Sequence, residues 1–269
     1  IMKLSMWSSY YMDLSPEDAI LEFEKNGYSY CELSDEHAAV LLGRGDAKIT
    51  GAKFKAFCDA HNVSVLQGHL FLTIRLCDES KPVVETLKNW LDLFEAIGIK
   101  SAVLHCDGMY DSNFSLEEKR ERNAAVLRQL TDYLKGKDLV ICLENLREFC
   151  ENADELLWYI NKLGSENLGI CLDTGHLNIS QFGDQEAFIK KAGKHLKALH
   201  IADNEGERDQ HMMPFGRGTV DIETVVLALK EIGYDKLFNF EIPGERSCPL
   251  EVRGYKLQYI KHCFNYLTR

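Results

Sequence analysis

The sequence predicts a single (β/α)8 barrel, for three reasons. The chain has 269 residues, 45% of them hydrophobic, and barrels of this kind typically have about 250 residues. Short runs rich in branched apolar residues alternate with longer amphipathic stretches about eight times, with no linker or shift in composition. The short runs are apolar throughout, as expected of parallel strands covered on both faces. We therefore expect residues 1–269 to form one domain.

The first unit consists of a strand at 3–7 and a helix that begins at Ser15-Pro16, because serine is a favoured N-cap and proline suits the first helical position. That helix should end near Gly27, since glycine readily adopts the left-handed conformation that terminates helices. Further strands are expected at 28–33, 63–69, 101–105, 139–144, 168–173, 196–200 and 237–241. Further helices are expected at 50–62, 81–97, 116–134, 153–163, 185–193, 222–232 and 250–266. A doubly wound open sheet usually has fewer strands and a glycine-rich phosphate loop after the first strand, which this sequence lacks.

Charge and cysteine content restrict the function classes. The net charge of −11 disfavours a nucleic-acid-binding surface. The nine cysteines are odd in number and include no C-x-x-C pair, which indicates free thiols in a reducing compartment. The sequence has no signal-like segment, and no apolar run approaches ~18 residues. We expect a cytoplasmic protein with no membrane partner, and we leave open whether it forms a homo-oligomer.

Ionisable side chains recur at the ends of the expected strands, where this fold builds its active site. They are Glu32, His69, His105, Glu144, Asp173, His200 and Glu241. A lone His or Glu at a strand end is usually solvated or hydrogen-bonded. In a closed ring, however, these side chains would converge, and their carboxylates would repel one another unless a cation or protons neutralised them. The pattern therefore predicts a divalent metal site.

Two loops add candidates on the same face. Asp173-Thr-Gly-His176 follows the sixth strand, and Asp209-Gln-His211 follows the seventh. The segment Phe215-Gly-Arg-Gly218 closes the second loop. Its glycines would permit a close backbone approach to a substrate, but a plain turn explains them equally well.

These motifs resemble the xylose-isomerase-like sugar phosphate isomerase/epimerase superfamily, which also contains endonuclease IV, the family 2 AP endonuclease. The resemblance spans nearly the whole chain. It is carried by residues 142–145, 169–176, 199–203, 209–218 and 240–242. It implies that one metal is held by Glu144, Asp173, His200 and Glu241.

The same resemblance implies further ligands, because the endonuclease branch holds three zinc ions. Its additional ligands match His69, His105, His176, Asp209 and His211. Isomerase-like members use some of these positions to bind sugar hydroxyls. The endonuclease pattern Asp-Thr-Cys-His is Asp-Thr-Gly-His176 here, and the loop after His69 shows no evident basic and aromatic combination for wedging into a duplex. We therefore expect a small-molecule carbohydrate as substrate rather than nucleic acid.

The leading hypothesis is a metal-dependent sugar or sugar-phosphate isomerase/epimerase that moves a proton through an ene-diolate. Oxygen and imidazole ligands suit Mn, Zn, Co or Mg. Glu144 and Glu241 are interpreted as paired acid/bases, with a purely ligating role as the alternative. The other hypotheses are a polynuclear phosphodiesterase or hydrolase like endonuclease IV, and a non-catalytic sugar-binding barrel.

Several residues are candidate substrate contacts. His176 would contact sugar hydroxyls, and Arg208 or Arg217 would hold a phosphate if the substrate carries one. Glu32 would either orient substrate or bond to a neighbouring strand end. Trp7 would either form an apolar wall of the sugar site or belong to the core.

Overall fold

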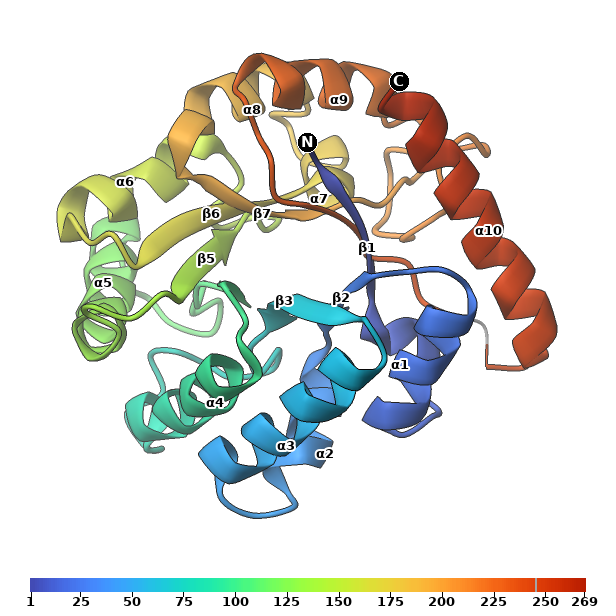
Figure 1. The fold of residues 1–269 in the computed structure, drawn as a ribbon. Helices are drawn as coiled ribbons and strands as arrows, with labels where there is room; N and C mark the ends of the chain where they lie inside the picture. The colour runs from blue at the N-terminus through green and yellow to red at the C-terminus, as the bar shows by residue number, and fades with distance from the viewer. Residues whose placement is uncertain (245) are drawn as a thin grey trace.

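In a computed structural model, which describes residues 1–244 and 246–269, eight parallel strands form a ring with the helices outside it (Figure 1). The strands are β1 (Lys3–Trp7), β2 (Tyr30–Leu33), β3 (Ser64–His69), β4 (Ser101–Leu104), β5 (Val140–Glu144), β6 (Leu168–Asp173), β7 (Leu196–His200) and β8 (Leu237–Phe240). Their order is β7-β6-β5-β4-β3-β2-β1-β8, so each strand neighbours the next in sequence and β1 also pairs with β8. Ile201 closes the ring through a parallel bridge to Phe240. The predicted barrel is confirmed.

The helices cover the outside of the ring. They are α1 (Pro16–Lys25), α2 (Asp35–Leu42), α3 (Ala47–Ala60), α4 (Val83–Ile97), α5 (Leu116–Tyr133), α6 (Ala153–Leu163), α7 (Thr174–Asn178), α8 (Gln185–Ala192), α9 (Ile222–Glu231) and α10 (Leu250–Leu267). Two short 3-10 helices, η1 (Ser8–Tyr11) and η2 (Gly193–His195), precede α1 and β7. None of the helices in the described part of the chain is long and apolar enough to cross a membrane.

Helix ends follow the expected side-chain signals. The Ser15 side chain accepts a hydrogen bond from the backbone of Asp18, which caps α1 as predicted. Ser115 and Glu118 form a reciprocal capping box at the start of α5. Gly98 has a φ of 92° and ends α4 in the left-handed conformation that favours glycine.

Two helices were not predicted from the sequence, α2 and α7. Both begin within two residues of a strand end and are at most eight residues long, so neither has a distinct amphipathic period. Ser34 caps α2 by accepting from the backbone of His37. Asp173 caps α7 by accepting from the backbone of His176 at 2.6 Å. These helices therefore fix side chains at the mouth of the barrel.

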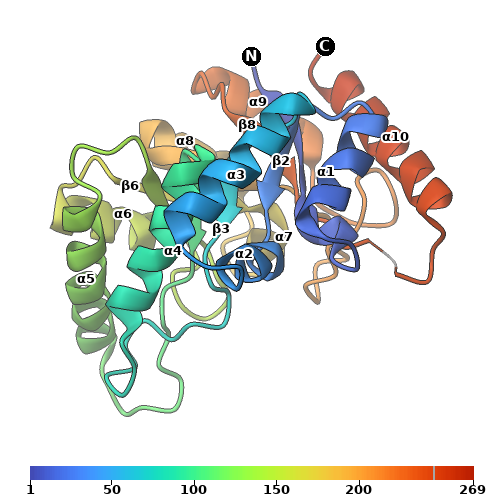
Figure 2. The ribbon, with the colours of Figure 1, turned by 60° about the horizontal axis from the view of Figure 1, so that its bottom comes forward.

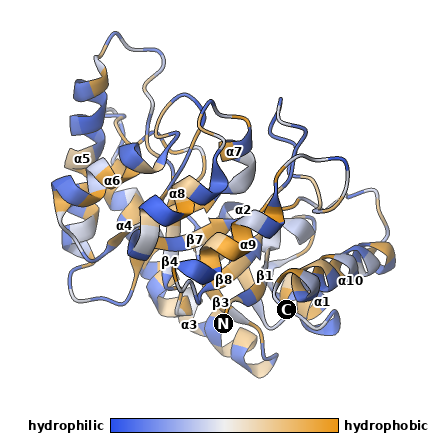
Figure 3. Ribbon diagram, turned by 90° about the horizontal axis from the view of Figure 1, so that it is seen from above, coloured by the Kyte–Doolittle hydropathy of each residue, from blue (hydrophilic) through white to orange (hydrophobic). Residues whose placement is uncertain are grey.

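The core lies in the strands and in the helix faces that pack against them. All six residues of β6 are buried, and Figure 3 shows the central strands in hydrophobic colours, with hydrophilic colours prominent on the surrounding helices. The nine cysteines are free thiols, as expected, and Cys142 and Cys171 are fully buried in the strands. The loops before α4 and α5 extend beyond the helices at one end of the molecule (Figure 2).

Candidate metal centre

The carboxyl ends of the strands surround a cavity of about 180 Å³. It is lined by Trp7, Asp35, His69, Leu72, His105, Glu144, His176, Asp209, His211 and Glu241. All of these except Trp7 and Leu72 are ionisable. The cavity therefore lies where the fold places active sites, and most of its wall consists of groups able to bind a metal or to move a proton.

Four predicted ligands form the centre of this site. Glu144 and Asp173 end β5 and β6, His200 ends β7, and Glu241 follows β8. All four side chains are buried, and one ligand atom from each lies within 4.8 Å of the others. The ring of parallel strands thus brings together residues that are up to 97 positions apart, from 144 to 241.

Two atoms of this group have no hydrogen-bond partner, Asp173 Oδ2 and His200 Nδ1. A buried polar atom without a partner is costly, so such atoms point to a missing ligand. The opposite nitrogen of the ring, His200 Nε2, lies 3.0 Å from Glu32 Oε1 and donates to it. Once Nδ1 gives up its proton, as metal binding requires, Nδ1 has a free lone pair for an ion. Zn binds His nitrogens and carboxylate oxygens at about 2.0–2.2 Å, so the four donors, which lie within 4.8 Å of one another, would have to move closer together around one ion. The group fits a divalent ion of the Mn, Zn, Co or Mg type.

Glu32 lies behind His200 and does not line the cavity. Its carboxylate is fully buried, and besides His200 it accepts a hydrogen bond from Asn239 Nδ2. Asn239 Oδ1 in turn accepts from Ser5 Oγ at 2.8 Å. Of the two roles considered for Glu32, the structure places it in a bond to another strand end rather than against a substrate.

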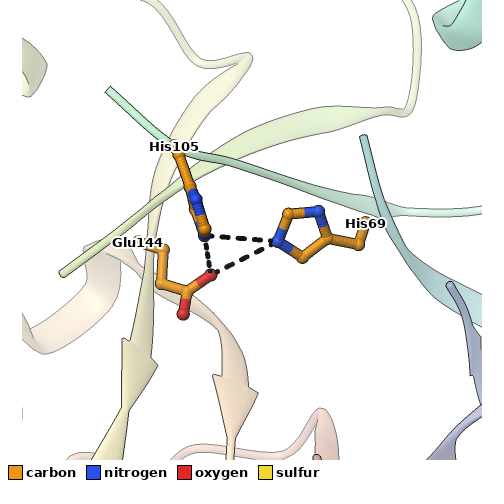
Figure 4. Close-up of side chains that lie close together, drawn as sticks. All are labelled: His69, His105 and Glu144. Atoms are coloured by element: carbon orange, nitrogen blue, oxygen red, sulfur yellow. Dashed lines mark hydrogen bonds and ion pairs between the residues drawn. The ribbon is translucent and has the colours of Figure 1, made fainter. Parts of the chain in front are cut away.

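A first flanking group consists of His69, His105 and Glu144 (Figure 4). His105 Nε2 lies 3.0 Å from Glu144 Oε2 and 3.4 Å from His69 Nε2. His69 Nε2 lies 3.6 Å from the same Glu144 oxygen. On its far side, His69 Nδ1 lies 2.6 Å from the carbonyl oxygen of Leu70, which fixes the orientation of the ring. Glu144 is therefore shared between this group and the centre.

A second flanking group consists of His176, Asp209 and His211. Asp209 Oδ2 lies 3.2 Å from His176 Nε2 and 3.1 Å from His211 Nε2. His176 Nδ1 also lies 3.1 Å from Glu144 Oε1. Burial disfavours a charge on His211, but Asp209 and Glu241 outweigh it and raise the pKa of His211 to about 10. The structure thus brings together all nine candidate ligands, in three adjoining groups.

The two glutamates of the centre have opposite pKa shifts in the metal-free protein. Burial raises the pKa of Glu241 to about 8, although the nearby His200 lowers it. Burial also raises the pKa of Glu144, but His200 and His105 outweigh burial and hold this pKa well below its usual range. The pair therefore combines one ionised carboxylate with one carboxyl group that holds a proton near neutral pH.

The predicted substrate contacts are only partly in place. Trp7 lines the cavity, and its Nε1 is buried with no hydrogen-bond partner. Neither predicted phosphate ligand lines it. Arg208 is exposed, and Arg217 is 74% exposed and pairs with Glu205 at 3.3 Å.

The glycine-rich segment contains a turn and packs against Asp203. The Asp203 carboxylate accepts from the backbone of Asn204 and of Val220. A Cβ atom on Gly218 would overlap this carboxylate, whereas one on Gly216 would meet nothing closer than 3.6 Å. Gly218 is therefore needed for close packing within the loop.

Sequence reasoning missed two residues. Asp35 lines the cavity because α2 begins two residues after β2 ends. The Ser34-Asp35 pair that follows the strand is typical of a helix start and could have indicated this position. Cys171 is not among the residues that the sequence predicts for the site, but its Sγ lies within 4.8 Å of ligand atoms of Glu144 and His200. The position of Cys171 in β6 could have indicated this, because residues 171 and 173 are two apart in a strand and so face the same side as the ligand Asp173.

The loop after β3 does contain an aromatic and a basic residue, which the sequence reading overlooked. Phe71 stacks on Trp90, with ring centroids 5.4 Å apart. Arg75 pairs with Asp111, with a shortest distance of 2.7 Å. Both side chains thus have a partner within the protein.

Comparison with known proteins places this site in context. The sequence matches the family described as xylose isomerase-like TIM barrel over residues 21–262. It is 30% identical over 156 residues to the probable endonuclease 4 of Mycoplasmopsis synoviae, covering 52% of this chain and 54% of that protein. It is 24% identical over 232 residues to the inosose isomerase of Bacillus velezensis, covering 81% and 80%. Several curated relatives are matched over only 45–61% of their own length.

The fold is also shared with solved structures. The D-psicose 3-epimerase of Clostridium cellulolyticum H10, crystallised with D-tagatose, superposes with a TM-score of 0.82. The two chains are 16% identical, and the superposition covers 100% of each. This likeness extends to the whole barrel, and the family match covers all of the ligand positions. The chain therefore belongs to the xylose isomerase-like TIM-barrel family.

Proposed function

We propose that the protein is a sugar isomerase or epimerase that depends on a divalent metal. The observation that carries this proposal is the buried group of Glu144, Asp173, His200 and Glu241, in which Asp173 Oδ2 and His200 Nδ1 have no hydrogen-bond partner. Family membership and the named sugar isomerase and epimerase relatives support the choice of substrate class.

A bound divalent ion would polarise the carbonyl and neighbouring hydroxyl oxygens of a sugar and so stabilise an ene-diolate. Proton transfer would be carried out by Glu144 and Glu241. Their carboxylates approach His200 Nδ1 at 3.3 and 3.4 Å from strands that lie well apart in the ring. One carboxylate would remove the proton next to the carbonyl, and the other would return it. Trp7 would form the apolar wall, and His176 would hold a sugar hydroxyl.

The direct test is solvent proton exchange. Protein loaded with Mg, Mn, Co or Zn is incubated in D2O with a panel of ketoses and aldoses, and mass spectrometry measures deuterium gained at carbon. We expect one deuterium per turnover, lost in Glu144→Gln and retained in Glu85→Gln, a control on an exposed carboxylate of α4. Absence of exchange across a broad panel with every metal would contradict the proposal.

A second candidate is phosphoester hydrolysis at a polynuclear metal centre. The two flanking groups favour it, because each offers three ligand atoms within 4.8 Å of one another, and polynuclear sites can stabilise both oxygens of a phosphoryl displacement. The probable endonuclease 4 relatives also support it. Elemental analysis of protein purified without chelator separates the two. One metal per chain favours the sugar enzyme, whereas three metals with cleavage of abasic DNA or of bis(p-nitrophenyl) phosphate favour the hydrolase.

A further inference from the structure

We propose that the cavity selects an uncharged sugar over a phosphorylated one, and that Asp35 sets this preference. The inference rests on the proposed isomerase or epimerase function and specifies its substrate class. Asp35 is the first residue of α2 and lines the cavity together with Trp7 and Leu72. Asp35 is not one of the nine candidate metal ligands.

Apart from imidazole rings, the described lining of the cavity offers no cationic side chain to a phosphate. Among the described residues that line it, none is a lysine or an arginine. A sugar phosphate carries about −1.5 to −2 charges near neutral pH, and proteins usually hold such a group with Arg, Lys or a helix N-terminus. Arg208 and Arg217 both lie outside the lining, and Arg217 is already paired with Glu205.

The two helices that begin at this mouth do not supply an anion site either. The first turn of α7 is capped by the Asp173 carboxylate, which accepts from the backbone of His176. The first turn of α2 contains Asp35 and Glu36, so its positive end faces carboxylates of its own chain.

The four histidines that line the cavity each lie beside a carboxylate, which opposes any positive charge on the imidazole ring. His176 and His211 both contact Asp209, while His69 and His105 both contact Glu144. Any positive charge on these rings is therefore opposed by a carboxylate within 3.6 Å. A phosphate group that entered the cavity would also be repelled by the four carboxylates in the lining, which belong to Asp35, Glu144, Asp209 and Glu241.

Asp35 and Trp7 fit a neutral polyol instead. Asp35 Oδ2 accepts one hydrogen bond, from the backbone of Leu72 at 3.3 Å, and a carboxylate has about four acceptor sites in all. Trp7 offers an indole ring and an Nε1 donor without a partner. A sugar presents both hydroxyl donors and acceptors and an apolar C–H face, which complements this pair.

Binding can be measured separately from turnover. The metal-loaded protein is titrated with D-psicose and with D-psicose 6-phosphate, and the intrinsic fluorescence of its three tryptophans is followed. We expect a saturable change with the free sugar, absent in Trp7→Phe and kept in Trp158→Phe, and at least tenfold weaker binding of the phosphate. Asp35→Asn should weaken binding of the free sugar several-fold. Asp35→Arg should reverse the preference, and Glu85→Gln, on the exposed carboxylate of α4, should leave it unchanged.

The outcomes separate this inference from the function on which it rests. Equal or tighter binding of the phosphate by the wild-type protein would overturn the inference, and it would leave isomerase activity possible. Unchanged selectivity in a folded Asp35→Asn protein, judged by circular dichroism and melting temperature, would overturn the role of Asp35. Selective binding of the free sugar without deuterium exchange would instead overturn the proposed enzyme function. If neither the free sugar nor its phosphate binds, the result counts against both the inference and the proposed function.

Discussion

The substitution Glu32→Gln tests whether residues behind the metal centre control metal affinity. Glu32 is buried and receives hydrogen bonds from His200 Nε2 and Asn239 Nδ2. A glutamine can satisfy only one of these donors, because its own amide group would then face the other. Since Asn239 also accepts from Ser5, reversing its amide would break that second bond. His200 would lose the partner that directs its free Nδ1 toward the centre.

The expected magnitude follows from this geometry. Loss of a hydrogen bond that orients a metal-binding histidine typically lowers metal affinity about 10- to 100-fold, and a thirtyfold loss corresponds to about 2 kcal/mol. With metal at 100 times the wild-type Kd, binding stabilises the wild-type protein by about 2.7 kcal/mol and a thirtyfold weaker variant by about 0.9 kcal/mol. For a chain of this size, the metal-induced rise in melting temperature should fall from about 5–11 °C to about 2–4 °C.

The assay compares melting temperature with and without Zn or Mn, and chelator competition gives the affinity directly. Glu85→Gln, on an exposed carboxylate paired with Lys88, is the matched control and should behave as wild type. Urea unfolding of the metal-free variant shows whether it remains folded. If a folded Glu32→Gln protein binds metal within twofold of the wild-type affinity, the reasoning about His200 is wrong.

Three further predictions concern the ligands, the loop glycines and the ion pair between Arg253 and Asp13. Asp173→Asn should reduce the metal found by elemental analysis to near zero, and retention of a full equivalent would remove Asp173 from the centre. Gly218→Ala should lower the free energy of unfolding by about 1–3 kcal/mol in urea titrations, whereas Gly216→Ala, which has room for a Cβ, should change it by less than about 1 kcal/mol; equal effects would contradict the packing argument. Arg253 is buried, bonds to both carboxylate oxygens of Asp13 and lowers the pKa of that carboxyl. Stability from this pair should be complete above the unfolded pKa of Asp13, about 3.9, and be lost as pH falls through the lower folded pKa. Asp13→Asn should therefore flatten the acid limb of a stability–pH profile, and an unchanged limb would refute this.

The fold was readable from sequence because the strands are short segments rich in apolar residues and several helices carry their own caps. The site was readable in outline because strand ends converge in a barrel, so that Glu144, Asp173 and His200 could be grouped without a structure. Local geometry was less accessible. The strand pattern alone does not show that Glu32, the third residue of β2, lies behind the site, whereas Asp35, three residues later, lines the cavity.

Arginines in the surface loop were the least predictable part. Whether Arg217 reaches a substrate depends on the path of the loop after β7, and that path is set by packing around Asp203 rather than by a repeating pattern. Short helices such as α7 raise the same difficulty, because tertiary contacts and a single capping carboxylate determine them.

The way the ring closes has a consequence for metal loading. β7 and β8 meet through a single isolated bridge between Ile201 and Phe240. Every other pair of neighbouring strands is joined by regular parallel hydrogen bonding. His200 precedes Ile201, and Glu241 follows Phe240. An ion held by both residues would link β7 to β8, the neighbouring strands with the fewest backbone pairs. When the ion is removed, amide hydrogen exchange should therefore become faster at these two strands before it does elsewhere in the barrel.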